Sequence, residues 1–362
     1  MSQAHPPESA PFVAPVWSDA PREASFNAWL SALASAHGLN LASLRSASAD
    51  ASFRRYFRVD AAVGSLIIMD APPDKEDCHP FVKVARLMHD AHLHVPQVLA
   101  WDEANGFMLL TDLGAKTMMQ VINRDDPQAN QGLYLQAVDA LIAWQLASQP
   151  DVLPPYDDAL LRRELALFPD WYLAQHLGVT LEGEDRRTLD AAFNLIIAQN
   201  LSSPRVYVHR DFMPRNLMIA NDGESSRLGV LDFQDAVYGP IIYDIASLMR
   251  DAFLSWDEDF CLDITIRYWD KARQAGLPVG DDFGEFYKGV EWMGLQRHLK
   301  VAGIFARLTL RDGKPQYLAD TPRFIHYIRS TCTRYIQLKP LLRLIERLEG
   351  IEVPNGYAFG RV

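Results

Sequence analysis

Residues 206–244 constrain the fold of this chain more than any other segment. They contain three short apolar runs, and each run ends in polar residues: 206–208 before His209, 217–219 before an Asn-Asp-Gly turn, and 228–231 before Asp232. Runs of this length between turn residues are typical of short strands. We therefore expect a loop that carries Asp211 and Asn216, and a neighbouring strand that ends at Asp232.

These three side chains are suited to phosphoryl transfer. The reaction requires a base beside the attacking hydroxyl, and oxygen ligands that hold Mg²⁺ against the phosphates of ATP. We interpret Asp211 as the base, and Asn216 and Asp232 as the ligands, because Mg²⁺ takes few protein oxygens together with phosphates and water. The alternative for Asp211 is an aspartate that only caps a turn. Its coincidence with the other two residues favours catalysis.

Several segments resemble known kinases. His209-Arg210-Asp211 through Asn216, followed by Asp232-Phe233, resembles the catalytic loop and metal-binding motif of protein kinases. Residues 231–235 and 243–246 look like the aminoglycoside phosphotransferase family of small-molecule kinases. Within that family the chain most resembles the bacterial anomeric kinases of N-acetylmuramate and N-acetylglucosamine, which act in peptidoglycan recycling. Besides the catalytic loop, the matching segments are 52–58, 69–73, 110–114 and 232–240.

The resemblance implies an α+β, bilobal protein-kinase-like fold with a small β-rich N-lobe and a large helical C-lobe. We place a disordered tail at residues 1–21, a nucleotide-covering N-lobe at 22–113, and a C-lobe with the catalytic loop and the acceptor site at 114–362. The implied cofactors are ATP and Mg²⁺. The implied substrate is a small-molecule amino sugar that is phosphorylated on its anomeric hydroxyl in the cytoplasm.

The resemblance also implies support of the catalytic loop by His209 and Asp244, and ATP binding by the segment that carries Leu110 and Asp112. The residues themselves offer candidates for sugar binding: Asp235, Tyr238, Trp292 and Arg297. Asp235 is equally compatible with a solvated loop charge, and Tyr238 and Trp292 with places in the core. Arg297 falls inside the apolar stripe of a helix expected over 285–308, where a guanidinium needs a partner or an opening to water. In one interpretation Arg297 binds the lactyl carboxylate of the acceptor. In the alternative it forms a structural ion pair, or it extends its charged end to solvent along an apolar surface.

The N-lobe departs from the protein-kinase pattern, which has a glycine-rich loop and a strand lysine paired with a helix glutamate. Here residues 47–53 lack the glycine triplet, Met69 stands at the lysine position, and the expected helix 81–91 contains no Glu. We therefore expect ATP phosphates to be met by arginines of the first hairpin: Arg54, Arg55 and Arg58. Strand alternation places Arg55 on the face opposite the other two. The alternative is that some of these arginines only face solvent.

Periodicity predicts a β-rich region followed by a long helical one, which is the order of a bilobal kinase. Strands are expected at 53–59, 65–69, 98–101 and 106–111. Helices are expected around 26–33 and at 81–91, 134–147, 159–175, 184–200, 243–253, 260–275, 285–308 and 322–349.

Composition narrows the function further. The formal net charge of −11 argues against a nucleic-acid partner, because no basic stripe could neutralise phosphates. No run approaches the ~20 apolar residues that cross a bilayer, and the N-terminus lacks the pattern of a secretory signal. Cys78, Cys261 and Cys332 lie far apart in the sequence and indicate reduced thiols in a cytosolic protein. The oligomeric state is not predicted.

Two other functions stay open at this point. The missing lysine and glutamate motivate a nucleotide-binding pseudokinase, although a protein of that kind has no need to keep a base and metal ligands together. An amino alcohol or an aminoglycoside is the alternative acceptor. Such a cation would need an acidic pocket, and the sequence does not place its candidate carboxylates relative to the site: Asp251, Asp257, Glu258 and Asp259.

Overall fold

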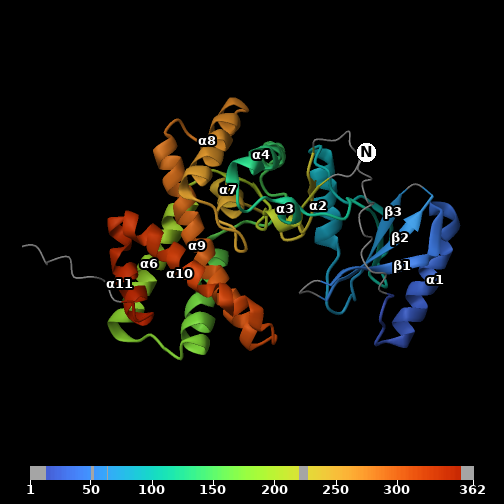
Figure 1. The fold of residues 1–362 in the computed structure, drawn as a ribbon, viewed down its shortest axis with the longest axis horizontal. Coiled ribbons are helices and arrows are strands. Elements are labelled where there is room, and N and C mark those ends of the chain that lie inside the picture. The colour runs from blue at the N-terminus through green and yellow to red at the C-terminus, as the bar shows by residue number, and fades with distance from the viewer. Residues whose placement is uncertain (1–13, 50–52, 63, 220–226, 352–362) are drawn as a thin grey trace, which may run out of the picture. The chain divides into compact units, whose positions relative to one another are not determined.

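The computed structural model describes residues 14–49, 53–62, 64–219 and 227–351, and Figure 1 labels its helices and strands. The chain divides into two compact units. The first comprises Met1–Lys116 and Met218–Asp235, and the second comprises Thr117–Leu217 and Ala236–Val362. The segment that follows the catalytic loop and carries Asp232 therefore belongs to the first unit.

The first unit is built on a five-stranded antiparallel sheet with strand order β1-β2-β3-β5-β4. Its strands are β1 (Leu39–Ala49), β2 (Arg55–Ala61), β3 (Ser65–Asp70), β4 (Val98–Asp102) and β5 (Phe107–Thr111). The four predicted strands are confirmed, with ends shifted by one or two residues. The sequence does not predict β1, because its small and polar residues lack the alternation of a half-buried strand.

One face of the sheet packs against α1 (Ala20–His37). Phe26 and Leu30 of this helix share a buried cluster with Phe57 and Ile68 of the sheet. Four aromatic rings strengthen the contact, since such pairs add to the burial of apolar area. The helix is therefore anchored to the sheet by its apolar side chains.

The predicted N-terminal tail is too long. Asp19 caps α1 by accepting a hydrogen bond from the Arg22 amide at 3.1 Å. The Trp17 ring lies 5.0 Å from Phe26 and 5.8 Å from Phe57. Ordered structure therefore begins before residue 22, and the first 13 residues of the predicted tail lie outside the described residues.

A second helix, α2 (His79–Asp90), lies on the side of the sheet away from α1 in Figure 1 and confirms the helix expected at 81–91. The ring of Phe81 in this helix lies 4.9 Å from the ring of Phe233. Strand β8 (Gly229–Val230) precedes Phe233, and its Val230 amide donates to the His94 carbonyl at 2.8 Å. These contacts fix the segment that carries Asp232 within the first unit.

The second unit is mostly helical. Its α-helices are α3 (Met118–Val121), α4 (Gln131–Leu146), α5 (Asp158–Leu167), α6 (Gly183–Leu201), α7 (Ile242–Met249), α8 (Glu258–Gln274), α9 (Phe283–Leu310), α10 (Thr321–Arg334) and α11 (Lys339–Leu348). Helix α9 is buried along most of its length and packs against α5, α6, α7 and α10 (Figure 1). It therefore organises the core of this unit.

Three of the predicted helices are wrong in extent. The single helix expected at 322–349 is two helices, because the chain is extended at Tyr335 and restarts before Pro340, at the first turn of α11. Proline is tolerated at that position but not in a helix interior. The helix expected at 159–175 is α5 followed by a π-helix, η2 (Phe168–His176). The helix expected at 243–253 is α7, which ends four residues earlier than predicted, at Met249. The remaining long helices of this unit are confirmed to within three residues at each end.

Candidate active site

The loop that carries Asp211 follows β6 (Arg205–Val208), which pairs with β9 (Val237–Pro240) in the second unit. Arg210 has a φ of 78°, in the left-handed region that non-glycine residues rarely adopt. Such a conformation costs roughly 1–3 kcal/mol and persists only where the surroundings enforce it. The residue immediately before Asp211 is therefore held in a strained conformation.

Asp244 enforces this conformation. Its side chain is fully buried near the start of α7, and its carboxylate accepts hydrogen bonds from the amides of His209 at 2.7 Å and Arg210 at 3.0 Å. The buried His209 ring accepts a further bond from the Asp211 amide through Nδ1 at 3.2 Å. Burial raises the pKa of Asp244, and the hydrogen bonds from these two amides oppose that rise. Asp244 and His209 together hold the loop backbone.

Asn216 and Arg297 bind the same loop from two sides. The Asn216 amide nitrogen donates to the Asp211 carbonyl at 2.9 Å, which leaves its amide oxygen as the atom with metal-ligand chemistry. Arg297, only 3% exposed on α9, donates from Nη1 to the Arg210 carbonyl at 2.7 Å. Its guanidinium also lies 4.9 Å from the ring centre of Tyr243. The structure therefore brings together Asp211, Asn216, Asp244, His209 and Arg297.

A buried ionic cluster beside the loop is absent from the sequence-based predictions. Glu164 of α5 accepts from Arg210 Nη2 at 2.7 Å and from Lys300 Nζ at 2.8 Å, and also pairs with the Tyr156 hydroxyl. Burial raises the pKa of Glu164, but Lys300 and Arg210 outweigh it and lower the pKa to about 2. The sequence signal for this cluster is Lys300, a second charged residue that lies one turn after Arg297 on the buried α9.

Asp232 belongs to the first unit, where it too has a left-handed φ of 62°. The Gln234 side chain donates to its Oδ1 at 2.9 Å, and the adjacent Phe233 is fully buried against α2. Asp235 is exposed. Tyr238 lies on β9 of the second unit, with its ring 6.4 Å from that of Tyr207.

Each of the three N-lobe arginines has a carboxylate partner. Arg54 pairs with Glu76 at 3.0 Å, and Arg58 binds Asp112 through Nε at 2.6 Å. Arg55 binds Asp70, which is fully buried and is shared with Arg22. Of the residues predicted at the nucleotide, Leu110 has a buried side chain and Asp112 is occupied by Arg58 and Ser65.

The two candidate metal ligands lie in different units, Asn216 in the second and Asp232 in the first. No group of three or more His, Cys, Asp or Glu side chains suited to a metal occurs in the part of the chain that the structure describes. The Asn216 amide oxygen and the Asp232 carboxylate are each hard oxygen donors, and Mg²⁺ usually takes one or two such groups together with substrate phosphates and water. Each residue therefore has the chemistry of a Mg²⁺ ligand.

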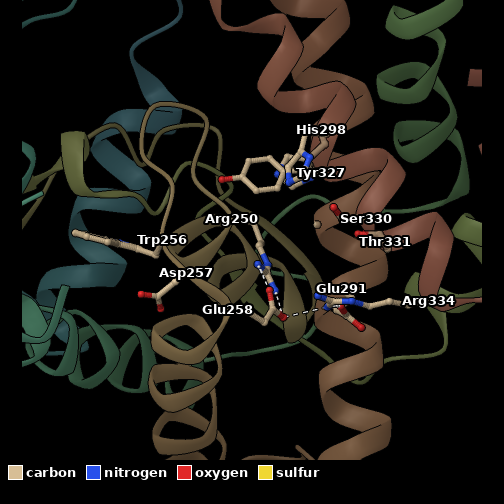
Figure 2. Close-up of a pocket in the computed structure, with 12 residues that line it drawn as sticks. Arg250, Trp256, Asp257, Glu258, Glu291, His298, Tyr327, Ser330, Thr331 and Arg334 are labelled. Atoms are coloured by element: carbon tan, nitrogen blue, oxygen red, sulfur yellow. Dashed lines mark hydrogen bonds and ion pairs between the residues drawn. The ribbon is translucent and has the colours of Figure 1, made fainter. Parts of the chain in front are cut away.

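A pocket of about 280 Å³ opens in the second unit between the ends of α7 and α8 and the helices α9 and α10 (Figure 2). Arg250 binds Glu258 in bidentate geometry at 2.8 and 3.0 Å, and Arg334 pairs with both Glu258 and Glu291. These pairings lower the pKa of Glu258 to about 2 against the raising effect of its burial. Glu258 and Glu291 are therefore paired with arginines, and the third carboxylate of the pocket, Asp257, caps α8 by accepting a hydrogen bond from the Phe260 amide at 2.8 Å.

The buried wall of this pocket is formed by a stacked pair of rings. His298 is 2% exposed and lies 4.6 Å from Tyr327 at an interplanar angle of 15° (Figure 2). Burial and the charge of Arg250 lower the pKa of His298 to about 3, so that the imidazole is neutral at pH 7. His298 directly follows Arg297 on α9. The helix therefore contacts the catalytic loop through Arg297 and the pocket through His298.

Comparison with known proteins agrees with this arrangement. Residues 43–280 match the model of the phosphotransferase enzyme family. The chain is 51% identical over 307 residues to the N-acetylmuramate/N-acetylglucosamine kinase of Pseudomonas aeruginosa, covering 85% of this chain and 89% of that one. It is 48% identical over 316 residues to the protein of the same name from Neisseria meningitidis, covering 86% and 93%.

Solved structures share the fold at low sequence identity. A putative aminoglycoside phosphotransferase from Ralstonia eutropha matches with a TM-score of 0.59 at 14% identity, over 89% of this chain and 98% of that one. The ADP-bound aminoglycoside phosphotransferase APH(2'')-Ib matches with a TM-score of 0.56 at 14% identity, over 85% and 97%. The predicted bilobal kinase-like fold class is confirmed.

Proposed function

Because this chain belongs to the phosphotransferase enzyme family, we propose that it transfers the γ-phosphate of ATP to the anomeric hydroxyl of N-acetylmuramate and N-acetylglucosamine. The product is a sugar 1-phosphate for cell-wall recycling. The single observation that carries the proposal is a sequence identity of 48–51%, over 85–86% of the chain, to three relatives that bear this name. Members of the family use a nucleoside triphosphate, and the catalytic loop suits that chemistry.

In this proposal Asp211 is the general base. The anomeric oxygen attacks the γ-phosphorus, its proton passes to the Asp211 carboxylate, and the bond from phosphorus to the β–γ bridging oxygen breaks to release ADP. The strained Arg210 backbone and the buried Asp244 fix the position of the base before substrate arrives. Asn216 and Asp232 would hold Mg²⁺, which neutralises phosphate charge when it is bound.

We propose that the acceptor is contacted by Asp235 and Tyr238, and that Arg297 adds positive charge beside Asp211. None of these three residues lines the pocket beside α9, so the size and charge of that pocket do not bear on the acceptor. The relatives that carry an amino-sugar kinase name support an amino sugar over a polycation.

The location that we propose is the cytoplasm, where ATP is supplied. The cysteines Cys78, Cys261 and Cys332 are buried free thiols, which is compatible with a reducing compartment. In the described part of the chain, no helix is long and apolar enough to cross a bilayer.

A panel of acceptors tests the proposal. The protein is incubated with ATP and Mg²⁺, and ADP release is measured with N-acetylmuramate, N-acetylglucosamine, glucose, choline and kanamycin. We expect the two N-acetyl sugars to react. Glucose should react poorly, because a site built for the N-acetyl group would be left with unpaired polar atoms. Faster turnover of kanamycin or choline than of either N-acetyl sugar would overturn the substrate assignment.

A further inference from the structure

The first unit lacks the strand lysine of protein kinases, yet the phosphates of a nucleotide still need a cation. We propose that Arg54, held by Glu76, replaces the lysine–glutamate pair and binds the phosphates of ATP. This inference rests on the proposed function, because it assumes a nucleotide substrate. The Arg54–Glu76 pair measures 3.0 Å, and its two side chains are 10% and 15% exposed.

Glu76 contacts the backbone before Arg54 as well as the Arg54 guanidinium. Its second oxygen accepts a hydrogen bond from the Phe53 amide at 3.3 Å, directly before Arg54. One carboxylate therefore fixes both the side chain of Arg54 and the backbone at the start of β2. Glu76 lies three residues before α2, which explains why a search of the helix for a glutamate does not find it.

The pairing of β2 with β3 brings Arg54 close to Met69, which stands where protein kinases have the strand lysine. In the β2–β3 ladder Tyr56 pairs with Met69, and Arg55 pairs with Asp70. Arg54 lies directly before Arg55, the first residue of the ladder, and side chains alternate along an extended chain, so Arg54 continues the face of Tyr56 and Met69. A diagonal neighbour on a sheet lies roughly 7–8 Å away, within the reach of an arginine. The positive charge would therefore come from the start of β2, whereas in protein kinases it comes from the lysine of the neighbouring strand, at the position of Met69 in β3.

The same helix connects this pair to the metal-ligand candidate. The ring of Phe81 in α2 packs against the ring of Phe233, the residue that follows Asp232, at 4.9 Å between centroids. Glu76 leads into α2, so the helix ties the Arg54 anchor and the Asp232 segment into one packed assembly within the first unit. A cation for the phosphates and a ligand for Mg²⁺ are needed in the same place during phosphoryl transfer.

The other two arginines hold the sheet together. Arg55 extends to the α1 side, where it shares Asp70 with Arg22 and lies 4.0 Å from the Trp17 ring centre. Arg58 makes two bonds to Asp112 and a third, at 2.8 Å, to the Gly114 carbonyl. These bonds join strands and loops of the unit. Arg54 is bound to a glutamate that precedes α2, so it is the arginine that most resembles the lysine–glutamate pair of protein kinases.

Nucleotide binding measured by calorimetry tests the inference without any sugar. Arg54→Gln should weaken binding of ADP and of a non-hydrolysable ATP analogue by about tenfold or more, the range for a lost hydrogen bond to a charged group. Adenosine, which has no phosphates, should bind both proteins equally. The matched control is Arg45→Gln, which removes an arginine of β1 that pairs with the half-exposed Asp60. It should bind all three ligands like the wild type.

A double variant separates phosphate binding from a structural role. Replacing both partners of a buried ion pair with apolar residues usually preserves the fold. Arg54→Met combined with Glu76→Met should therefore keep the thermal unfolding temperature near that of the wild type and still lose the preference for ADP over adenosine. Wild-type ADP affinity in this folded variant would overturn the inference. If the wild type binds ADP through Arg54 but phosphorylates no sugar, the proposed function fails and the inference stands.

Discussion

Arg210 and Asp232 share an uncommon property: both are non-glycine residues with left-handed backbone, at φ of 78° and 62°. One directly precedes the proposed base and the other is a proposed metal ligand. The Asp244 carboxylate binds the Arg210 amide, and the Gln234 side chain binds the Asp232 carboxylate. Strain that is maintained in this way is a feature of functional sites, because it fixes reacting groups before the substrate binds.

The base is tested by Asp211→Asn. The amide cannot accept the proton of the acceptor hydroxyl, so we expect kcat to fall by roughly 10²–10⁴-fold, the range for general base catalysis. The affinity for ADP, measured by calorimetry, should stay near that of the wild type. A variant that keeps most of its turnover would reduce Asp211 to a turn residue.

The metal ligands are tested by titrating Mg²⁺ at saturating ATP. Asp232→Ala should abolish activity, and Asn216→Ala should raise the Mg²⁺ concentration needed for half-maximal rate, since each removes one oxygen ligand. Asp90→Ala, which changes an exposed carboxylate of α2 in the same unit as Asp232, is the control and should leave the Mg²⁺ requirement unchanged. Unchanged half-saturation in Asn216→Ala, together with activity in Asp232→Ala, contradicts the assignment.

The buried Glu164 predicts how stability depends on pH. Its pKa in the folded protein is about 2, below the ordinary value of 4.5. The stabilisation is therefore fully present above pH 4.5 and is lost as the pH falls toward 2. Linkage puts the loss on the order of 3 kcal/mol. Glu164→Gln should flatten this part of the profile, measured by urea unfolding between pH 3 and 6. Glu285→Gln, at an exposed site on α9, should keep the wild-type slope.

At the residue scale, the sequence predicts the groups whose spacing is local and misses those that depend on tertiary contacts. Asp211 and Asp232 come after apolar runs and Asn216 comes before one, so their order in the sequence selects them. Glu164 and Lys300 are 136 residues apart, and their pairing depends on how α5 packs against α9. The apolar stripe predicts that Arg297 is buried, which the structure shows, but its partner, a backbone carbonyl, has no sequence signature.

At the element scale, α9 (Phe283–Leu310) determines the geometry of the second unit. It supplies Arg297 to the catalytic loop, Lys300 to the Glu164 cluster and His298 to the pocket wall. Its position depends on a close approach to the preceding helices. A Cβ on Gly303 would lie 2.2 Å from the Leu167 carbonyl oxygen at the end of α5. No side chain larger than hydrogen fits there.

Two glycines of α9 provide a matched test of this packing. Gly303→Ala should destabilise the protein by about 2 kcal/mol or more, because backbone must move to admit the methyl group. Gly294→Ala introduces the same methyl group at an ordinary contact distance of 3.4 Å from Arg250. It should be neutral or stabilising by up to about 1 kcal/mol, the helix propensity of alanine over glycine. Equal unfolding temperatures for the two variants would show that α9 can shift.

Element boundaries show where sequence patterns stop being informative. The break between α10 and α11 is marked by Pro340, a signal that is present in the sequence but is outweighed by the apolar periodicity on both sides. The change from α5 to the π-helix is likewise marked by a proline, Pro169, while the π-helical form itself has no sequence signature. Strand β1 is held by pairing with β2 through irregular registers rather than by its own hydrophobic pattern.

At the scale of the whole molecule, the two units carry different parts of the proposed chemistry. The second unit holds the base, Asn216 and the side chains that fix the catalytic loop, and the first holds Asp232 and the arginine–glutamate pair. The sequence predicts two lobes from the order of strands and helices. It does not reveal that residues 218–235 return to the first unit, because that depends on the contact between Phe233 and α2.

The central claim, anomeric transfer by this chain, is tested most directly by NMR. N-acetylglucosamine and its methyl glycoside are each incubated with the protein, ATP and Mg²⁺, and the position of any new phosphate is read from phosphorus–proton couplings. We predict that the free sugar gives only the 1-phosphate, and that the methyl glycoside does not react because its accepting oxygen is capped. Phosphate on any other oxygen of the free sugar, or turnover of the methyl glycoside, would contradict the account.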